Sequence, residues 1–197
     1  MGFLHKIRPL LYAVMIVAVG AFAWVNFIQP RMTETVADQL GRGDYFLTTT
    51  GGQAFTQASL RGQPSAVFFG FTHCPEICPT TLADLAVIKE DMGLTADDLP
   101  IYFITIDPER DTAALLKDYV EWVPGAQGVT GSPEEVAKAV KAFRAYAKRV
   151  PLADGDYTMD HSAYVMLFDD RGRFFEPIGY QEDFERAQNK IRRLLNS

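Results

Sequence analysis

The sequence has little cysteine: only Cys74 and Cys78 among 197 residues. A disulfide between residues so close in sequence would remove little chain entropy, so this pair is poorly placed to stabilise the fold. The scarcity excludes a small disulfide-stapled scaffold. It favours redox or metal chemistry for the two thiols.

Histidine and basic charge are also scarce. The chain has three histidines, and 19 Lys and Arg stand against 25 Asp and Glu, for a net charge of −6. All the acidic residues lie beyond Arg31, so the chain after this point is the more acidic part. Without a basic patch to neutralise phosphates, a nucleic-acid partner is not expected.

Charge is absent altogether from residues 10–28 (LLYAVMIVAVGAFAWVNFI). This apolar run matches the ~20 residues with which a helix crosses a bilayer. Lys6 and Arg8 precede it, which predicts residues 1–9 as a cytoplasmic tail. Residues 10–28 are therefore predicted to be an uncleaved single-pass membrane anchor, and residues 29–43 a polar tether.

A cleaved signal peptide is the alternative interpretation of this segment. Ala21-Phe22-Ala23 has the small-x-small pattern of a cleavage site after an apolar run. The apolar run continues past this site, which favours the anchor. The short tail carries no Arg/Ser-rich transit segment, so the predicted location is the cytoplasmic (inner) membrane of a bacterium, with the C-terminal domain in the periplasm.

Residues 44–197 predict one α/β domain. The expected strands are a hairpin at 44–56, buried strands at 64–72 and 100–106, a short strand at 126–129, and a hairpin of 163–168 with 173–177. The expected helices are 80–93, 112–122, 132–146 and 181–195. Asp111 is predicted to cap the second helix, and Ser132 with Glu135 to form a capping box at the third.

The order of these elements is thioredoxin-like. A buried strand leads directly into the loop of Cys74 and Cys78, and this loop leads into a helix. The fold is therefore predicted to be a thioredoxin-like α/β domain, with a central mixed sheet flanked by helices and an extra N-terminal β-hairpin.

A helix N-terminus stabilises the thiolate form of cysteine, which both attacks disulfides and binds soft metals. Three residues separate Cys74 from Cys78, whereas thiol–disulfide oxidoreductases usually have two, and Pro75 and Pro79 stiffen the loop. The loop can close a disulfide or hold two sulfurs on one ion, so position and spacing leave both roles open.

Two thiolates make an incomplete metal site, so a third ligand is needed. His5 lies in the predicted cytoplasmic tail, and His73 is expected to point away because side chains alternate at a strand end. His161 precedes the strand at 163–168, where thioredoxin-like folds bring the chain against the cysteine loop and commonly have a cis-proline. A histidine at this position can be an ordinary core residue. Because His161 is expected to lie opposite two exported cysteines, we expect it to be a metal ligand.

The segments FTHCPEICPTTL (71–82), TIDPERDT (105–112) and DHSAYVMLFDDRG (160–172) closely resemble the Sco/SenC family. Its members are membrane-anchored, thioredoxin-fold copper proteins that help to assemble the copper centre of cytochrome c oxidase. The resemblance implies that Cys74, Cys78 and His161 ligate one copper ion per chain. These ligands suit Cu(I), and Cu(II) can be held as well.

Two carboxylates are candidates to support the ligands rather than to bind the ion. Asp160 adjoins His161, and Asp107 lies at the end of the second buried strand, an edge where α/β proteins place functional groups. A turn or cap role is the alternative for each. Zinc would accept the same ligands, but no catalytic carboxylate can be placed beside the site.

The function that the resemblance implies is a copper metallochaperone. It would receive copper from an upstream periplasmic donor and deliver it to the CuA centre of cytochrome c oxidase subunit II. Such a protein is not a classical enzyme.

The alternative is a membrane-anchored thiol–disulfide reductase, with Cys74 and Cys78 as its redox-active pair, which keeps the cysteines of that subunit reduced, or a related redox sensor. A peroxidase is disfavoured, because Phe71 stands where peroxiredoxin-type sites have threonine, three residues before Cys74.

Overall fold

The computed structural model describes residues 3–28, 37–153 and 155–197, and the chain falls into two units, residues 1–38 and 39–197. In the first unit, helix α1 (Phe3–Ala23) and a π-helical turn (Trp24–Ile28) cover the predicted anchor. Among the described residues, no helix is long and apolar enough to cross a membrane. The anchor stays a prediction, and most of the predicted tether, residues 29–36, lies outside the described residues.

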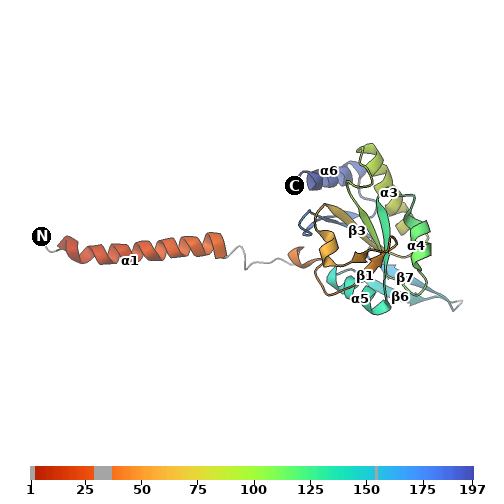
Figure 1. The fold of residues 1–197 in the computed structure, drawn as a ribbon, viewed down its shortest axis with the longest axis horizontal. Helices are drawn as coiled ribbons and strands as arrows, with labels where there is room; N and C mark the ends of the chain where they lie inside the picture. Colours follow the sequence, from red (N-terminus) through yellow and green to blue (C-terminus); the bar gives the residue numbers. More distant parts are fainter. Residues whose placement is uncertain (1–2, 29–36, 154) are drawn as a thin grey trace. The chain divides into compact units, whose positions relative to one another are not determined.

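The second unit is built on a seven-stranded mixed sheet with the strand order β2-β1-β5-β4-β3-β8-β9 (Figure 1). Strands β3, β4 and β5 run parallel, and the other pairings are antiparallel. The strands are β1 (Leu47–Thr49), β2 (Ala54–Phe55), β3 (Ser65–Gly70), β4 (Ile101–Thr105), β5 (Ala126–Thr130), β8 (Tyr164–Phe168) and β9 (Phe174–Gly179). The predicted central mixed sheet and N-terminal hairpin are therefore confirmed.

Helices cover this sheet, and 3-10 turns lie along the chain outside its strands. The helices are α3 (Ile77–Asp91), α4 (Ala113–Val120), α5 (Pro133–Ala142) and α6 (Phe184–Leu195), and the 3-10 turns are Ala37–Gln39 and Gln57–Leu60. Helix α3 contacts α6, and α4 contacts β5. Every residue of β3 is buried, as expected for a central strand that is covered on both faces.

A second, two-stranded sheet consists of β6 (Ala147–Pro151) and β7 (Tyr157–His161), which pair antiparallel. The sequence pattern does not predict this hairpin, because its residues are mostly exposed or half-buried and lack a clear alternation of apolar and polar side chains. The helix predicted over 132–146 ends earlier, at Ala142, because Arg144 adopts a positive φ of 51° that a helix does not allow.

Two predicted helix caps are wrong in part. The side chain of Thr112, not that of Asp111, caps α4 by accepting the N–H of Leu115 at 3.2 Å. At α5, Ser132 accepts the N–H of Glu135 as predicted. The Glu135 carboxylate, however, accepts the N–H of Phe46 at 2.6 Å instead of closing the capping box, because the fold brings the N-terminal segment against this helix.

Candidate metal centre

The two cysteines lie where β3 passes into α3. Helix α3 begins at Ile77, so Cys78 is in its first turn, whereas Cys74 lies in the preceding loop. The backbone N–H of Cys78 donates to Sγ of Cys74 at 3.4 Å. First-turn N–H groups have no partner within their own helix, and here the Cys74 sulfur supplies one.

The end of β3 and the start of α3 lie very close together, and this allows Cys78 to be buried between them. A Cβ atom on Gly70, the last residue of β3, would lie 2.7 Å from Sγ of Cys78 and 2.6 Å from the ring of Phe103. No side chain fits in that space. Glycine at this position therefore lets the helix start pack directly on the strand end.

The two thiols have opposite pKa shifts. The pKa of Cys74 is lowered to about 4, mainly by a hydrogen bond from the Cys78 side chain and also by the Cys78 N–H, against the opposing effect of burial. The pKa of Cys78 is raised, because its proton is held in the bond to Cys74 and because the group is buried. At neutral pH the pair therefore carries a thiolate on Cys74 and a thiol on Cys78.

The third group, His161, is the last residue of β7. Its Nε2 lies 3.6 Å from Sγ of Cys78, and its Nδ1 lies 2.8 Å from the carbonyl oxygen of Ser162. A carbonyl oxygen can only accept, so Nδ1 is the donor to Ser162, and in the tautomer with its one proton on Nδ1 the Nε2 lone pair faces the sulfurs. The ring packs edge-on against Phe71, with centroids 5.7 Å apart.

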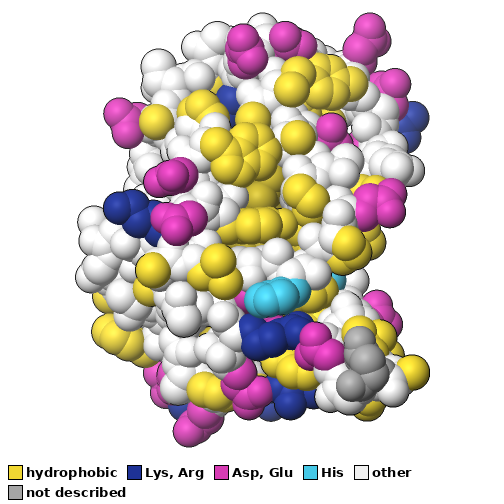
Figure 2. Space-filling view, turned by 90° about the vertical axis from the view of Figure 1, so that its right-hand side faces the viewer, with side chains coloured by type: hydrophobic (Ala, Val, Ile, Leu, Met, Phe, Trp, Pro, Cys, Tyr) yellow, Lys and Arg dark blue, Asp and Glu magenta, His cyan; other side chains and the backbone are white. Residues whose placement is uncertain are grey.

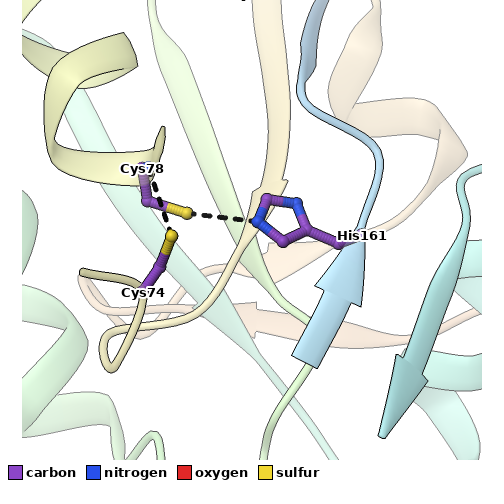
Figure 3. Close-up of side chains that lie close together, drawn as sticks. All are labelled: Cys74, Cys78 and His161. Atoms are coloured by element: carbon purple, nitrogen blue, oxygen red, sulfur yellow. Dashed lines mark hydrogen bonds between the residues drawn. The ribbon is translucent and has the colours of Figure 1, made fainter. Parts of the chain in front are cut away.

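The ligand atoms of Cys74, Cys78 and His161 all lie within 4.8 Å of one another, and in Figure 3 both sulfurs and Nε2 point toward a common space. Within the described ranges this is the one group of three His, Cys, Asp or Glu residues close enough to share an ion. Figure 2 shows histidine on a face that also carries apolar side chains and Lys or Arg. Two sulfurs and one imidazole nitrogen suit Cu(I) or zinc.

The remaining predicted residues lie outside this group. The His73 side chain is half exposed and its Nδ1 lies 3.1 Å from Oγ1 of Thr72, in agreement with the expected outward direction. Asp160 is exposed, and the structure gives no hydrogen bond between it and His161. Asp107 is buried and accepts hydrogen bonds from Arg110 and Tyr157. Neither partner is one of the three ligand residues, so Asp107 is connected to the site only through other residues. Nothing is described of the His5 side chain.

Sequence reasoning missed the role of Asp111. Its buried carboxylate accepts the N–H of Thr72 at 3.1 Å and the hydroxyls of Thr72 and Thr105, each at 2.6 Å. These bonds hold the turn that leads to Cys74. Asp111 stands just before a predicted helix, and this position suggested only a helix cap. The local sequence does not reveal its bond to Thr72, which is 39 positions away.

The chain is similar to a family of known proteins along most of its length. The model of the SCO1/SenC family matches residues 33–196. Protein SCO2 homolog, mitochondrial, from Mus musculus is 39% identical over 173 residues, which cover 85% of this chain and 68% of the relative. Protein SCO1, mitochondrial, from Saccharomyces cerevisiae is 36% identical over 156 residues, which cover 76% of this chain and 52% of the relative. The chain thus spans about two thirds or less of the length of these relatives.

Solved structures also match most of this chain. The structure of Bradyrhizobium japonicum ScoI with copper bound is 43% identical with a TM-score of 0.71, and the match covers 79% of this chain and 99% of that one. The structure of yeast Sco1 with copper bound is 35% identical with a TM-score of 0.71, and the match covers 81% of this chain and 90% of that one.

Proposed function

The chain belongs to the SCO1/SenC family, and on this premise we propose that it is a copper metallochaperone for the assembly of cytochrome c oxidase. The observation that carries the proposal is the convergence of Cys74, Cys78 and His161 within 4.8 Å. The copper that is present in the ScoI and yeast Sco1 structures supports copper as the ion.

In the proposed function, copper binds to the site when both cysteines are reduced. The three ligand groups differ in whether they must lose a proton before they can bind the ion. The Cys74 thiolate is already ionised at neutral pH, and Nε2 of His161 has a free lone pair. Cys78 holds a proton that must leave when a metal binds, so binding releases a proton. A site with only three protein ligands would leave room for an incoming ligand from a target, which could take over the ion as Cys74, Cys78 and His161 release it.

We propose that the target is the CuA centre of cytochrome c oxidase subunit II, and that the copper comes from an upstream periplasmic donor. The apolar segment at residues 10–28 supports a membrane anchor in the bacterial cytoplasmic membrane. The domain of residues 44–197 would then lie in the periplasm, on the side where the CuA centre is assembled. Tethering would keep this domain close to its membrane-bound target.

A thiol–disulfide reductase is the second candidate, and the lowered pKa of Cys74 favours it. The Cys74 thiolate would attack one sulfur of a target disulfide, which forms a mixed disulfide between Cys74 and that sulfur and releases the other target sulfur as a thiolate. Cys78 would lose its proton and attack Sγ of Cys74, which frees the second target thiol and leaves a Cys74–Cys78 disulfide. Two electrons thus pass to the target, or to a signalling partner if the chain is a redox sensor.

Transfer and reduction can be measured separately on the full chain. Copper-loaded parent protein is mixed with the reduced, metal-free CuA domain of subunit II, and the metal-free parent with the oxidised domain. We expect His161→Ala to lose copper transfer, and Cys74→Ala and Cys78→Ala to lose both reactions. His73→Ala is the control and should match the parent. If the copper-loaded parent transfers no copper while the metal-free parent reduces the oxidised domain, the reductase function replaces the chaperone.

A further inference from the structure

The loop that joins β4 to α4 contacts both halves of the metal centre. We infer that residues 105–111, here called the bracket, position His161 against the cysteine loop through Asp107, Arg110 and Tyr157. This inference rests on the proposed copper site. It assigns Arg110 and Tyr157 as positioning residues, since neither touches the three ligand atoms.

The bracket is tied to the cysteine loop by Asp111. The Asp111 carboxylate accepts the N–H and hydroxyl of Thr72, two residues before Cys74. It also accepts the hydroxyl of Thr105, whose oxygen in turn accepts the N–H of Asp107 at 2.9 Å. Asp111 and Asp107 are both buried, so these bonds are shielded from water. The bracket and the start of the cysteine loop therefore form one hydrogen-bonded unit.

The bracket is tied to the hairpin of His161 by Asp107 and Arg110. One carboxylate oxygen of Asp107 accepts the Tyr157 hydroxyl at 2.8 Å, and the other accepts Nε of Arg110 at 2.5 Å. The Arg110 guanidinium also donates to the backbone oxygen of Tyr157 at 2.9 Å. Tyr157 begins β7, the strand that ends at His161. Both its side chain and its backbone are thus fixed to the bracket.

Two guanidinium groups reinforce this attachment. Those of Arg110 and Arg149 lie over the ring of Tyr157, 3.7 Å and 3.9 Å from its centroid, at the range of favourable cation–π contacts. Arg149 comes from β6 and also pairs with Glu109 of the bracket. The Arg110 side chain is only 18% exposed, so its contacts are less weakened by solvent than those of the exposed Arg149 pair.

The hairpin needs such side-chain attachment because β6 and β7 form a sheet of their own. No ladder of backbone hydrogen bonds joins them to the seven-stranded sheet in the described ranges. The ligand geometry around a metal depends on the groups that orient each ligand, and losing one such group typically costs ~10–100-fold in metal affinity. The bracket supplies this orientation for His161, at the far end of the strand from Tyr157.

The test is a double-mutant cycle on the full chain. Arg110→Ala and Tyr157→Phe are each made in the parent and in His161→Ala, and Cu(I) affinity is measured by competition with a chromophoric chelator. Tyr157→Phe keeps the ring that both guanidiniums contact and removes only the bond to Asp107. Tyr146→Phe is the matched control, since Tyr146 is half exposed and no bond of its hydroxyl is described.

We expect Arg110→Ala to weaken copper binding by roughly tenfold, Tyr157→Phe to weaken it less, and Tyr146→Phe to leave it unchanged. In the His161→Ala background the same changes should alter affinity by less than about twofold, the usual error of additivity. In the variant with Arg110→Ala alone, the imidazole nitrogen coupling in the electron paramagnetic resonance spectrum of the Cu(II) form should also differ from that of the parent. Equal losses in both backgrounds would mean a general loss of structure and would overturn the inference.

The same variants distinguish failure of the proposed function from failure of this inference. If the parent binds no copper, the proposed function fails, and the metal-free chain still tests the bracket. Amide hydrogen exchange in β7 must then be faster in Arg110→Ala than in the parent, with exchange in α3 unchanged and Tyr146→Phe equal to the parent. Exchange in β7 that stays at the parental rate in Arg110→Ala would overturn the inference.

Discussion

Sγ of Cys78 and Nε2 of His161 lie 3.6 Å apart, although 83 positions separate the two residues in the chain. Cys78 comes from the first turn of α3 and His161 from the end of a hairpin outside the main sheet. Their closeness turns a two-thiol loop into a three-ligand group.

Replacing His161 should weaken copper binding far more than replacing His73. His161→Ala removes a ligand atom, so Cu(I) affinity should fall by at least the ~10–100-fold that loss of a supporting group costs a metal site. His73 is half exposed and hydrogen-bonds with Thr72, so His73→Ala should match the parent. Chelator competition on both variants measures this, and equal affinities would remove His161 from the site.

Cys74 should be the thiol that reacts first. Its pKa is lowered to about 4, so alkylation by iodoacetamide should be nearly independent of pH from 6 to 8 and should slow only as pH falls toward that value. Cys78→Ala removes the main hydrogen bond to the thiolate, so the pKa of Cys74 should rise and the rate at pH 6 should fall. Mass spectrometry of peptides identifies the labelled residue; labelling of Cys78 first would contradict the assignment.

Gly70→Ala should destabilise the domain. The added Cβ would lie 2.7 Å from Sγ of Cys78, and the strand and the helix start are both buried. Overpacking of this kind typically costs ~1–3 kcal/mol in the free energy of unfolding. Gly179→Ala is the control, because its new Cβ meets only Glu182 Oε2, at 3.7 Å. Urea unfolding compares the two, and equal stabilities would show that the site adapts freely.

Asp169 should stabilise the β8–β9 turn in a pH-dependent way. Burial raises the pKa of its carboxyl, but the N–H and side chain of Arg173 outweigh this and lower it below the ordinary 3.8. The stabilisation is therefore complete above that ordinary pKa and is lost as pH falls through the lower folded-state value. Asp169→Asn should cost ~1–3 kcal/mol at pH 7.

Urea unfolding of the parent and Asp169→Asn at several pH values measures this difference. The gap in stability between them should shrink in acid, because protonation removes the parent's advantage. A gap that stays constant from pH 7 down to pH 3 would show that the carboxylate charge has no part in holding the turn.

The strand and helix that carry the cysteines were predictable, because a continuous apolar run and a helical apolar face are local patterns. The structure confirms a buried β3 and a following helix, although α3 begins at Ile77 rather than at Thr80. The β6–β7 hairpin was not predicted, because its stability depends on contacts of Tyr157 with a distant loop. Asp111 was assigned to a cap for the same reason, since its partner Thr72 is 39 positions away in sequence.

The sequence by itself determined the chemistry that is available: two thiols at a predicted helix start, one imidazole in the right segment, and an apolar segment at residues 10–28. These follow from residue identity and from periodicity along the chain. Only the tertiary structure decided that the three ligand atoms meet, that Cys74 rather than Cys78 is the thiolate, and that residues 105–111 join both halves of the site. The meeting of the ligand atoms and the connection through residues 105–111 depend on contacts between residues far apart in the chain. The choice of Cys74 depends on burial and on hydrogen bonds at the start of α3, which the local sequence pattern does not encode.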